Sequence, residues 1–178
     1  MVNDTAMLRN AAVRAMLRDM RLMSVNVTGD GNCFYRALSL ILHGNEDHHT
    51  ELRRSIADHL TRNYKYIFNV SNIVTHADNI SIEQHIQRMR LDGVWAGEEA
   101  ILAAADFLKR ELHVFKYVTS SVISPTVYTP ASGSCLGSPL RIAFLEPGHF
   151  HAVFDDTNSN KSNNDIFIEN SNNNHLNV

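Results

Sequence analysis

The hydrophobic pattern of the sequence changes near Leu112, and this change constrains the fold more than any other feature. Before it, apolar residues recur with a helical period, most clearly in the alanine-rich run after Gly97. After it the period is two, which predicts strands over 112–117, 140–145 and 149–154. Helices followed by strands predict an α/β (α+β) fold, in which a small central sheet packs between helices.

The length of 178 residues fits one domain with tails. We expect residues 1–23 to form an N-terminal helix that packs on the domain, because their apolar residues have approximately helical spacing. Residues 24–156 then form the domain itself. Residues 157–178 contain nine asparagines in 22 positions, a composition that predicts a disordered tail.

Charge, hydropathy and cysteine content exclude several classes of protein. A formal net charge of -3 lacks the basic footprint of a general nucleic-acid binder. No apolar run approaches the roughly 18 residues of a membrane span. Two cysteines, Cys33 and Cys135, make neither a disulfide framework nor a paired-cysteine metal site, and they fit a reducing, cytoplasmic compartment.

A glycine-flanked loop places Cys33 at the start of a strongly apolar helix, in the run GDGNCFYRA over residues 29–37. The free N–H groups and the dipole of a helix N-terminus stabilise a thiolate, which is the nucleophilic form of cysteine. The backbone N–H groups of the loop, at Gly31 and Asn32, are candidates to face the oxyanion of an attacked carbonyl. Cysteines also begin ordinary helices, so position alone leaves catalysis and simple packing equally open.

A thiol nucleophile needs a base, usually histidine, and the chain contains ten histidines. His149 opens a predicted strand directly after Pro147 and Gly148, and His151 points to the same face of that strand. These two are therefore the candidates for base and orienting residue, in either order. For the other eight, solvated surface or ordinary packing is the simpler interpretation.

The cysteine block resembles the signature of the ovarian-tumour (OTU) family of cysteine deubiquitinases, with Asp30–Ala37 as the most specific match. Three further blocks resemble the family in the same order: His49–Arg53, Gly93–Leu108 and Gly148–Phe150. The resemblance spans about Val25 to Asp155 and implies an OTU-like, cysteine-protease-like fold in this region.

The resemblance implies that Cys33 is the nucleophile and His149 the general base. Asp30 matches the acidic residue that the family places three positions before its cysteine, and it either shapes the oxyanion loop or stabilises the imidazolium. Where the family often has Asn or Asp two residues after the histidine, this chain has His151. The third member of the triad is therefore open between Asp30 and His151.

The implied reaction is hydrolysis of the isopeptide bond after the C-terminal glycine of ubiquitin, through a thioester, with no metal or cofactor. Trp95 either packs under the site, the simpler interpretation, or contacts substrate. Tyr66, Ile67 and Phe68 either contact ubiquitin or pack the helical side. The alternatives are a module that binds ubiquitin without cutting it, a hydrolase of a ubiquitin-like modifier, and an interaction protein that acts through its asparagine-rich tail. We expect a monomer in the cytoplasm, or in a host cytosol if the chain is a viral or bacterial effector.

Overall fold

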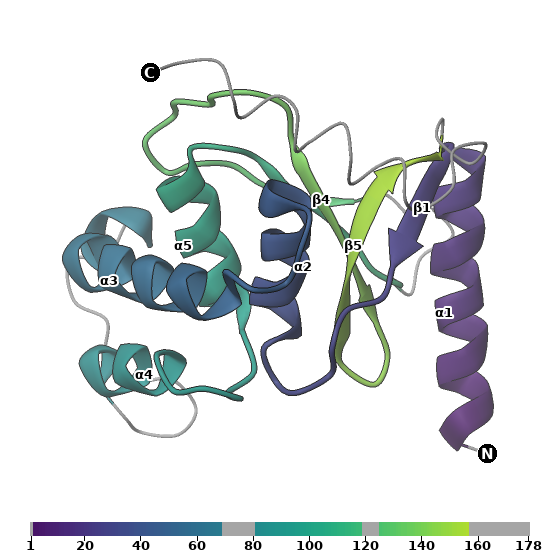
Figure 1. Ribbon diagram of the computed structural model, residues 1–178, viewed down its shortest axis with the longest axis horizontal. Coiled ribbons are helices and arrows are strands. Elements are labelled where there is room, and N and C mark those ends of the chain that lie inside the picture. The colour runs from purple at the N-terminus through teal and green to yellow at the C-terminus, as the bar shows by residue number, and fades with distance from the viewer. Residues whose placement is uncertain (1, 69–80, 119–124, 157–178) are drawn as a thin grey trace.

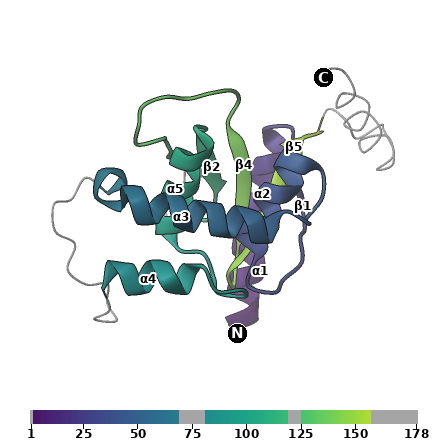
Figure 2. The same ribbon diagram turned by 60° about the vertical axis from the view of Figure 1, so that its left-hand side comes forward.

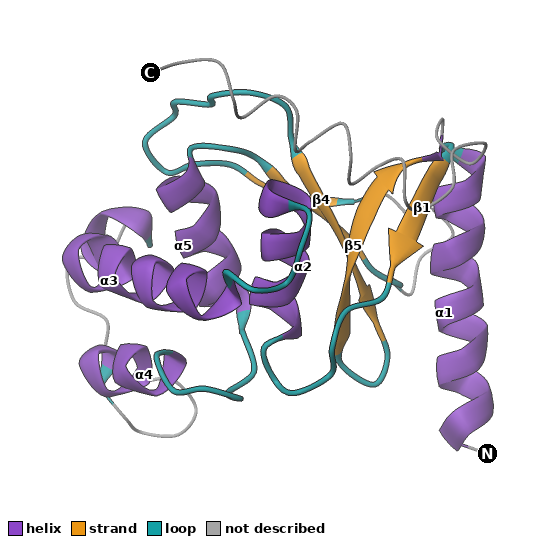
Figure 3. Ribbon diagram, viewed as in Figure 1, coloured by secondary structure: helices purple, strands orange, loops and turns teal. Residues whose placement is uncertain are grey.

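The computed structural model describes residues 2–68, 81–118 and 125–156, which form one five-stranded sheet with helices on both faces (Figures 1 and 3). The strand order is β1-β5-β4-β2-β3, and every neighbouring pair is antiparallel except β2 and β4. The helices are α1 (Val2–Asp19), α2 (Cys33–His43), α3 (His49–Ile67), α4 (Ile82–Met89) and α5 (Glu98–Leu108). The strands are β1 (Leu22–Val25), β2 (Leu112–Phe115), β3 (Thr126–Tyr128), β4 (Leu140–Leu145) and β5 (His149–Asp155). The predicted α/β fold with a central sheet between helices is confirmed.

The sheet separates two apolar clusters. The larger cluster packs α2, α3, α4 and α5 against one face, where Ile142, Phe150 and Ala152 are buried. The smaller cluster packs α1 against the other face through Val13 and Leu17. Figure 2 shows the same layers from the side, with α3 across α5 and α4 beneath it. β5 therefore lies between the helix that begins at the cysteine and the N-terminal helix.

The N-terminal helix ends earlier than the sequence predicts. It stops at Asp19, and Arg21 adopts a left-handed conformation with φ 56° that reverses the chain. Leu22–Val25 then pairs with β5 as an edge strand, where apolar periodicity had suggested that the helix continues to Met23. Strand pairing thus decides these last residues, because β5 offers them hydrogen-bond partners that lie far away in the sequence.

Local signals set the ends of the other helices. Gly44 ends α2 with φ 75°, and its N–H donates to the carbonyl of Leu40. Ser81 and Gln84 form a capping box at the start of α4. α5 ends when Lys109 turns left-handed, and β2 starts three residues later.

The N-terminal helix α1 also binds the turn between β4 and β5 through side chains. The side-chain amide of Asn10 donates to the carbonyl of Glu146 and accepts the N–H of the same residue, both at 2.8 Å. Arg9 forms an ion pair with the Glu146 carboxylate at 2.8 Å. Because His149 follows this turn, α1 helps to fix where β5 begins. The predicted tail at 157–178 lies outside the described residues, and in the described part no helix is long and apolar enough to cross a membrane.

Candidate active site

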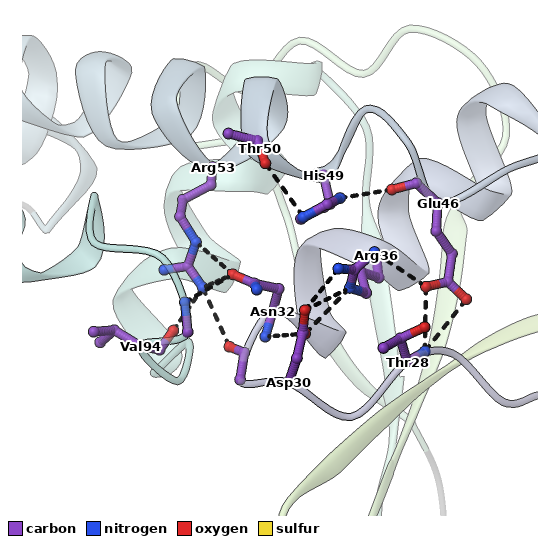
Figure 4. Close-up of polar contacts among 11 residues, drawn as sticks. Thr28, Asp30, Asn32, Arg36, Glu46, His49, Thr50, Arg53 and Val94 are labelled. Carbon is purple, nitrogen blue, oxygen red and sulfur yellow. Dashed lines mark hydrogen bonds and ion pairs between the residues drawn. The ribbon is translucent and has the colours of Figure 1, made fainter.

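The loop before Cys33 is held in one conformation by glycine and by Asp30. Gly31 has φ 84°, and a Cβ there would lie 1.9 Å from the carbonyl oxygen of Gly93, so only glycine fits. The Asp30 carboxylate accepts the N–H of Asn32 at 3.0 Å and the guanidinium of Arg36 at 2.6–3.1 Å (Figure 4). Hydrogen bonding to Arg36 outweighs burial and holds the pKa of Asp30 well below its usual range.

The carboxylate of Asp30 is engaged by Arg36 and Asn32. Its geometry therefore fits the loop-shaping role and not the role of stabilising an imidazolium. The same contact bears on the backbone N–H groups that the sequence offers for an oxyanion. The N–H of Asn32 is already accepted by Asp30, which leaves the N–H groups of Gly31 and Cys33 as the candidates that can face an oxyanion.

Cys33 is the first residue of α2 and is 8% exposed. The first N–H groups of a helix have no intrahelical acceptors, so they and the helix dipole favour an anion at this position. Glu46 continues the polar network beside it, accepting from Arg36 and from the Thr28 N–H. The nucleophile candidate is thus a nearly buried thiol at the first residue of a helix.

His149 lies against the same loop. A Cβ on Gly29 would be 3.5 Å from its Cε1 and 3.8 Å from its Nδ1. The residues that follow the two candidates also touch, since the rings of Phe34 and Phe150 pack edge to face at 5.4 Å. The fold therefore brings together two segments that are more than 100 positions apart in the chain.

The hydrogen bonds of His149 define its tautomer. Its Nε2 lies 2.9 Å from Oδ1 of Asn26 and 3.1 Å from the carbonyl oxygen of Val27. A carbonyl oxygen can only accept, so Nε2 carries the proton. In the neutral imidazole, Nδ1 then holds a lone pair on the side of Gly29, which is the state that a general base needs.

Asn26 is the site residue that sequence reasoning missed. It follows β1 in the short alternating stretch 24–28, where no motif distinguishes it from a loop asparagine. The pairing of β1 with β5 carries it to His149. Only the register between these two strands could have identified Asn26, and that register cannot be read from the sequence.

His151 does not contact His149 in the way that the orienting role requires. The two rings pack edge to face at 5.1 Å, while Nε2 of His149 bonds to Asn26 and Val27. The Nδ1 of His151 is buried without a hydrogen-bond partner in the described part of the chain. Burial, followed by the positive charges of His149 and Arg14, lowers the pKa of His151 to about 4. His151 is therefore a neutral packing neighbour at neutral pH.

The simpler interpretation of Trp95 was that it packs under the site, but the structure places it at the surface. It is 67% exposed, and its ring covers Gly148, where a Cβ would be 2.7 Å from the indole. Gly148 directly precedes His149, so the indole forms part of the surface beside the site.

The other proposed substrate contacts divide into two groups. Ile67 is buried and Phe68 packs against the larger cluster, so core packing describes both. Tyr66 is 55% exposed, and its hydroxyl donates to the carbonyl of Ala131 at 2.8 Å. It lies at the C-terminal end of α3, whereas the network around Cys33 meets the N-terminal half of that helix (Figure 4).

The described residues contain no group of three or more His, Cys, Asp or Glu side chains that could hold a metal ion. Cys33 and Cys135 are both free thiols, and Cys135 is exposed. The described groups near the start of α2 are a free thiol, an imidazole with a hydrogen-bonded Nε2 and backbone N–H donors.

Comparison with known proteins finds that most of this chain is similar to OTU-domain proteins. A family model described as "Vertnin, OTU domain" matches residues 24–89. The "OVARIAN TUMOR DOMAIN-containing deubiquitinating enzyme 7" of Arabidopsis thaliana is 35% identical over 140 residues, which cover 79% of this chain and 35% of the relative. Human "OTU domain-containing protein 1" is 28% identical over 147 residues, covering 78% of this chain and 28% of the relative. The chain thus spans about a third of the length of the curated relatives that it matches.

Solved structures share the fold at lower sequence identity. The OTU domain of OTUD1 superposes with a TM-score of 0.70 at 23% identity, over 86% of this chain and 99% of that one. An OTU deubiquitinase from Wolbachia pipientis wMel, solved bound to ubiquitin, has a TM-score of 0.55 at 20% identity, over 77% of this chain and 98% of that one. These likenesses show the fold.

Proposed function

Because this chain belongs to the ovarian-tumour (OTU) domain family, we propose that it is a thiol-dependent deubiquitinase that hydrolyses the isopeptide bond after the C-terminal glycine of ubiquitin. The observation that carries the proposal is the state of His149. Its Nε2–H is bound by Asn26 and Val27, which leaves Nδ1 free to accept a proton on the side of the loop that holds Cys33. Relatives named as deubiquitinating enzymes, and neighbours solved bound to ubiquitin, support the choice of substrate.

The proposed reaction has two halves. Nδ1 of His149 takes the proton of the Cys33 thiol, and the thiolate attacks the isopeptide carbonyl, whose oxyanion is held by backbone N–H groups. The intermediate collapses to a thioester as the lysine amine leaves with the proton from His149. In the second half His149 deprotonates a water molecule, which attacks the thioester. Ubiquitin then leaves with a free carboxylate, and Cys33 regains its proton.

We assign the orienting role to Asn26 in place of the two earlier candidates. Asn26 fixes the Nε2–H tautomer at 2.9 Å, whereas Asp30 is bound by Arg36 and Asn32, and His151 meets His149 only edge to face. An amide oxygen on Nε2 also stabilises the imidazolium that forms when Nδ1 is protonated.

Trp95 is the proposed wall for the substrate tail, because its exposed indole lies over Gly148 beside His149. Tyr66 remains a candidate contact with the body of ubiquitin, on account of its exposure. We further propose that the protein acts as a monomer in the cytosol, where a catalytic thiol stays reduced.

Cleavage of a panel of di-ubiquitins by the wild type, Cys33→Ala and His149→Ala tests the function. We expect the wild type to release mono-ubiquitin and both variants to lose turnover. His151→Ala should reduce turnover less than His149→Ala. A wild type that binds di-ubiquitin without cutting it would support the alternative of a ubiquitin-binding module. Cleavage only of substrates made from ubiquitin-like modifiers would support the alternative of a hydrolase for such a modifier.

A further inference from the structure

Arg53 is a buried cation directly behind the loop that carries Cys33. It lies on α3 and is 2% exposed. Its Nε and Nη2 donate to Oδ1 of Asn32 at 3.1 and 2.8 Å, and Nη2 also donates to the carbonyl of Gly31 at 3.2 Å. Its remaining bonds reach the carbonyls of Met89 and Val94, both at 2.7 Å, and Figure 4 shows the bond to Val94.

All of these acceptors are neutral. A buried charge is normally paired with an opposite charge, yet in the described part of the chain the guanidinium of Arg53 forms no ion pair with a carboxylate. It lies over the ring of Tyr35 at 4.2 Å instead. Burial lowers the pKa of Arg53, while the groups that act in the opposite direction are Tyr35, Asp92, Asp30 and Cys33. A guanidinium stays protonated in spite of such burial, so this positive charge is permanent.

The bonds of Arg53 also join two segments of the site. Oδ1 of Asn32 receives the Gly93 N–H at 3.2 Å as well as the guanidinium. Gly31 and Gly93 are in backbone contact that leaves no room for a side chain. The loop before Cys33 and the segment that leads to Trp95 are therefore braced against each other through one guanidinium.

We propose that Arg53 is a positioning residue for hydrolysis, which fixes the oxyanion loop through Gly31 and Asn32 and supplies an unpaired positive charge that favours the anions formed at Cys33 and at the substrate carbonyl. The inference rests on the proposed function and deepens it. Donors that are fixed before the reaction need no reorganisation when charge develops, and a charge in a buried setting acts more strongly than one in water. The cost of burying an unpaired guanidinium is then offset when the anion forms.

The geometric part is tested with Arg53→Lys, which keeps the charge but cannot form the forked contacts. With a fluorogenic ubiquitin C-terminal amide as substrate, we expect kcat to fall at least 10-fold while KM changes less than threefold. Arg90→Lys is the matched control, because Arg90 joins the end of α4 to α3 through Asp58 and Thr61, and neither of these described bonds reaches a residue of the site. Its kcat should stay within twofold of the wild type.

The electrostatic part is tested with Asn32→Asp, which keeps an oxygen for Arg53 to bind but gives it a counter-ion. The rate of alkylation of Cys33 by iodoacetamide is followed against pH by mass spectrometry, with Cys135→Ser in every protein because that thiol is exposed. We expect the pH of half-maximal alkylation to rise by about one unit in Asn32→Asp, together with a loss of kcat.

The outcomes separate this inference from the proposed function. A folded Arg53→Lys with wild-type kcat overturns it, as does a folded Asn32→Asp with an unchanged alkylation profile. If Arg53→Lys does not fold, the result for Asn32→Asp decides alone. A wild type that fails to cleave ubiquitin defeats the proposed function, while the alkylation experiment still tests the effect of Arg53 on Cys33.

Discussion

At the scale of single residues, the site depends on how one imidazole is held. Two acceptors on Nε2 of His149 select the tautomer with a basic Nδ1, and one of them is a backbone carbonyl that mutation cannot remove. Asn26 is the part of this arrangement that is open to test. The neighbouring His151 packs its ring edge to face against His149 and forms no described hydrogen bond with it. Its position in the sequence had made it a candidate for the orienting role.

Replacement of Asn26 by alanine should lower kcat by about 10- to 100-fold, or roughly 1.4–2.7 kcal/mol of transition-state stabilisation, with little change in KM. The reason is that the imidazolium loses its side-chain acceptor while substrate contacts remain. Steady-state kinetics measure the effect. Asn26→Asp, which retains the acceptor oxygen, should recover most of the activity, and an Asn26→Ala enzyme with normal kcat would show that Val27 alone orients His149.

His151 predicts a pH dependence of stability. Its folded-state pKa of about 4 lies below the ordinary histidine value of 6.5, so the unfolded chain binds more protons between these values. The contribution to stability is complete above pH 6.5 and is lost as the pH falls toward 4. We expect about 1–2 kcal/mol less stability at pH 5 than at pH 7 from this residue, measured by urea unfolding. His151→Gln should reduce that difference, and an equal difference in the variant would assign it to other groups.

At the scale of elements, the N-terminal helix is an integral part of the site's support. It covers the face of the sheet opposite α2, and its Asn10 binds the turn from which β5 and His149 start. The edge strand that follows the helix leads to Asn26. One element therefore steadies both partners of the bond between Asn26 and His149.

Asn10→Ala should lower the free energy of unfolding by about 1–2 kcal/mol, because it removes a donor and an acceptor from the main chain of Glu146. We also expect a fall in kcat, since the turn that places His149 loses its anchor. Thermal melting and kinetics on the same preparation provide both values. Arg18→Ala, an exposed change on the same helix, is the control, and equal losses in the two variants would argue against a specific role for Asn10.

At the scale of the whole molecule, the described helices and strands and both apolar clusters are complete before residue 157. The last strand ends at Asp155, and the N–H of Asp156 donates to the carbonyl of Arg21. The proposed catalytic residues, Cys33 and His149, and the orienting residue Asn26 all lie within this part of the chain.

A chain that ends at Asp156 should therefore keep the thermal stability of the full chain and its kcat on the fluorogenic ubiquitin amide. Each contact on which the proposed mechanism depends is retained in it. A large loss of either value would assign a role to residues 157–178, as the hypothesis of a tail-driven interaction protein requires. Truncation before residue 150, which removes most of β5, is the control that should unfold the protein.

The sequence alone predicted what depends on neighbours in the chain. The helix that begins at Cys33 and the strand 140–145 follow from spacing and turns that act over a few residues. Cys33 could be named because it stands in a short block that is specific by itself, and His149 because its block follows the others in the order that the family has. The same short-range signals failed at 20–23, where the register with β5 overrode the helical period.

Only the tertiary structure decided which side chains meet. Asn26 reaches His149, Trp95 lies over Gly148, and Arg53 binds the loop before Cys33, each across more than 20 positions of sequence. Such contacts depend on strand register and helix packing, which are set by the burial of the whole core. The local sequence around the contacting residues carries no signal for them. A sequence therefore states which chemical groups are present, while their partners, tautomers and unpaired charges follow from how the layers pack.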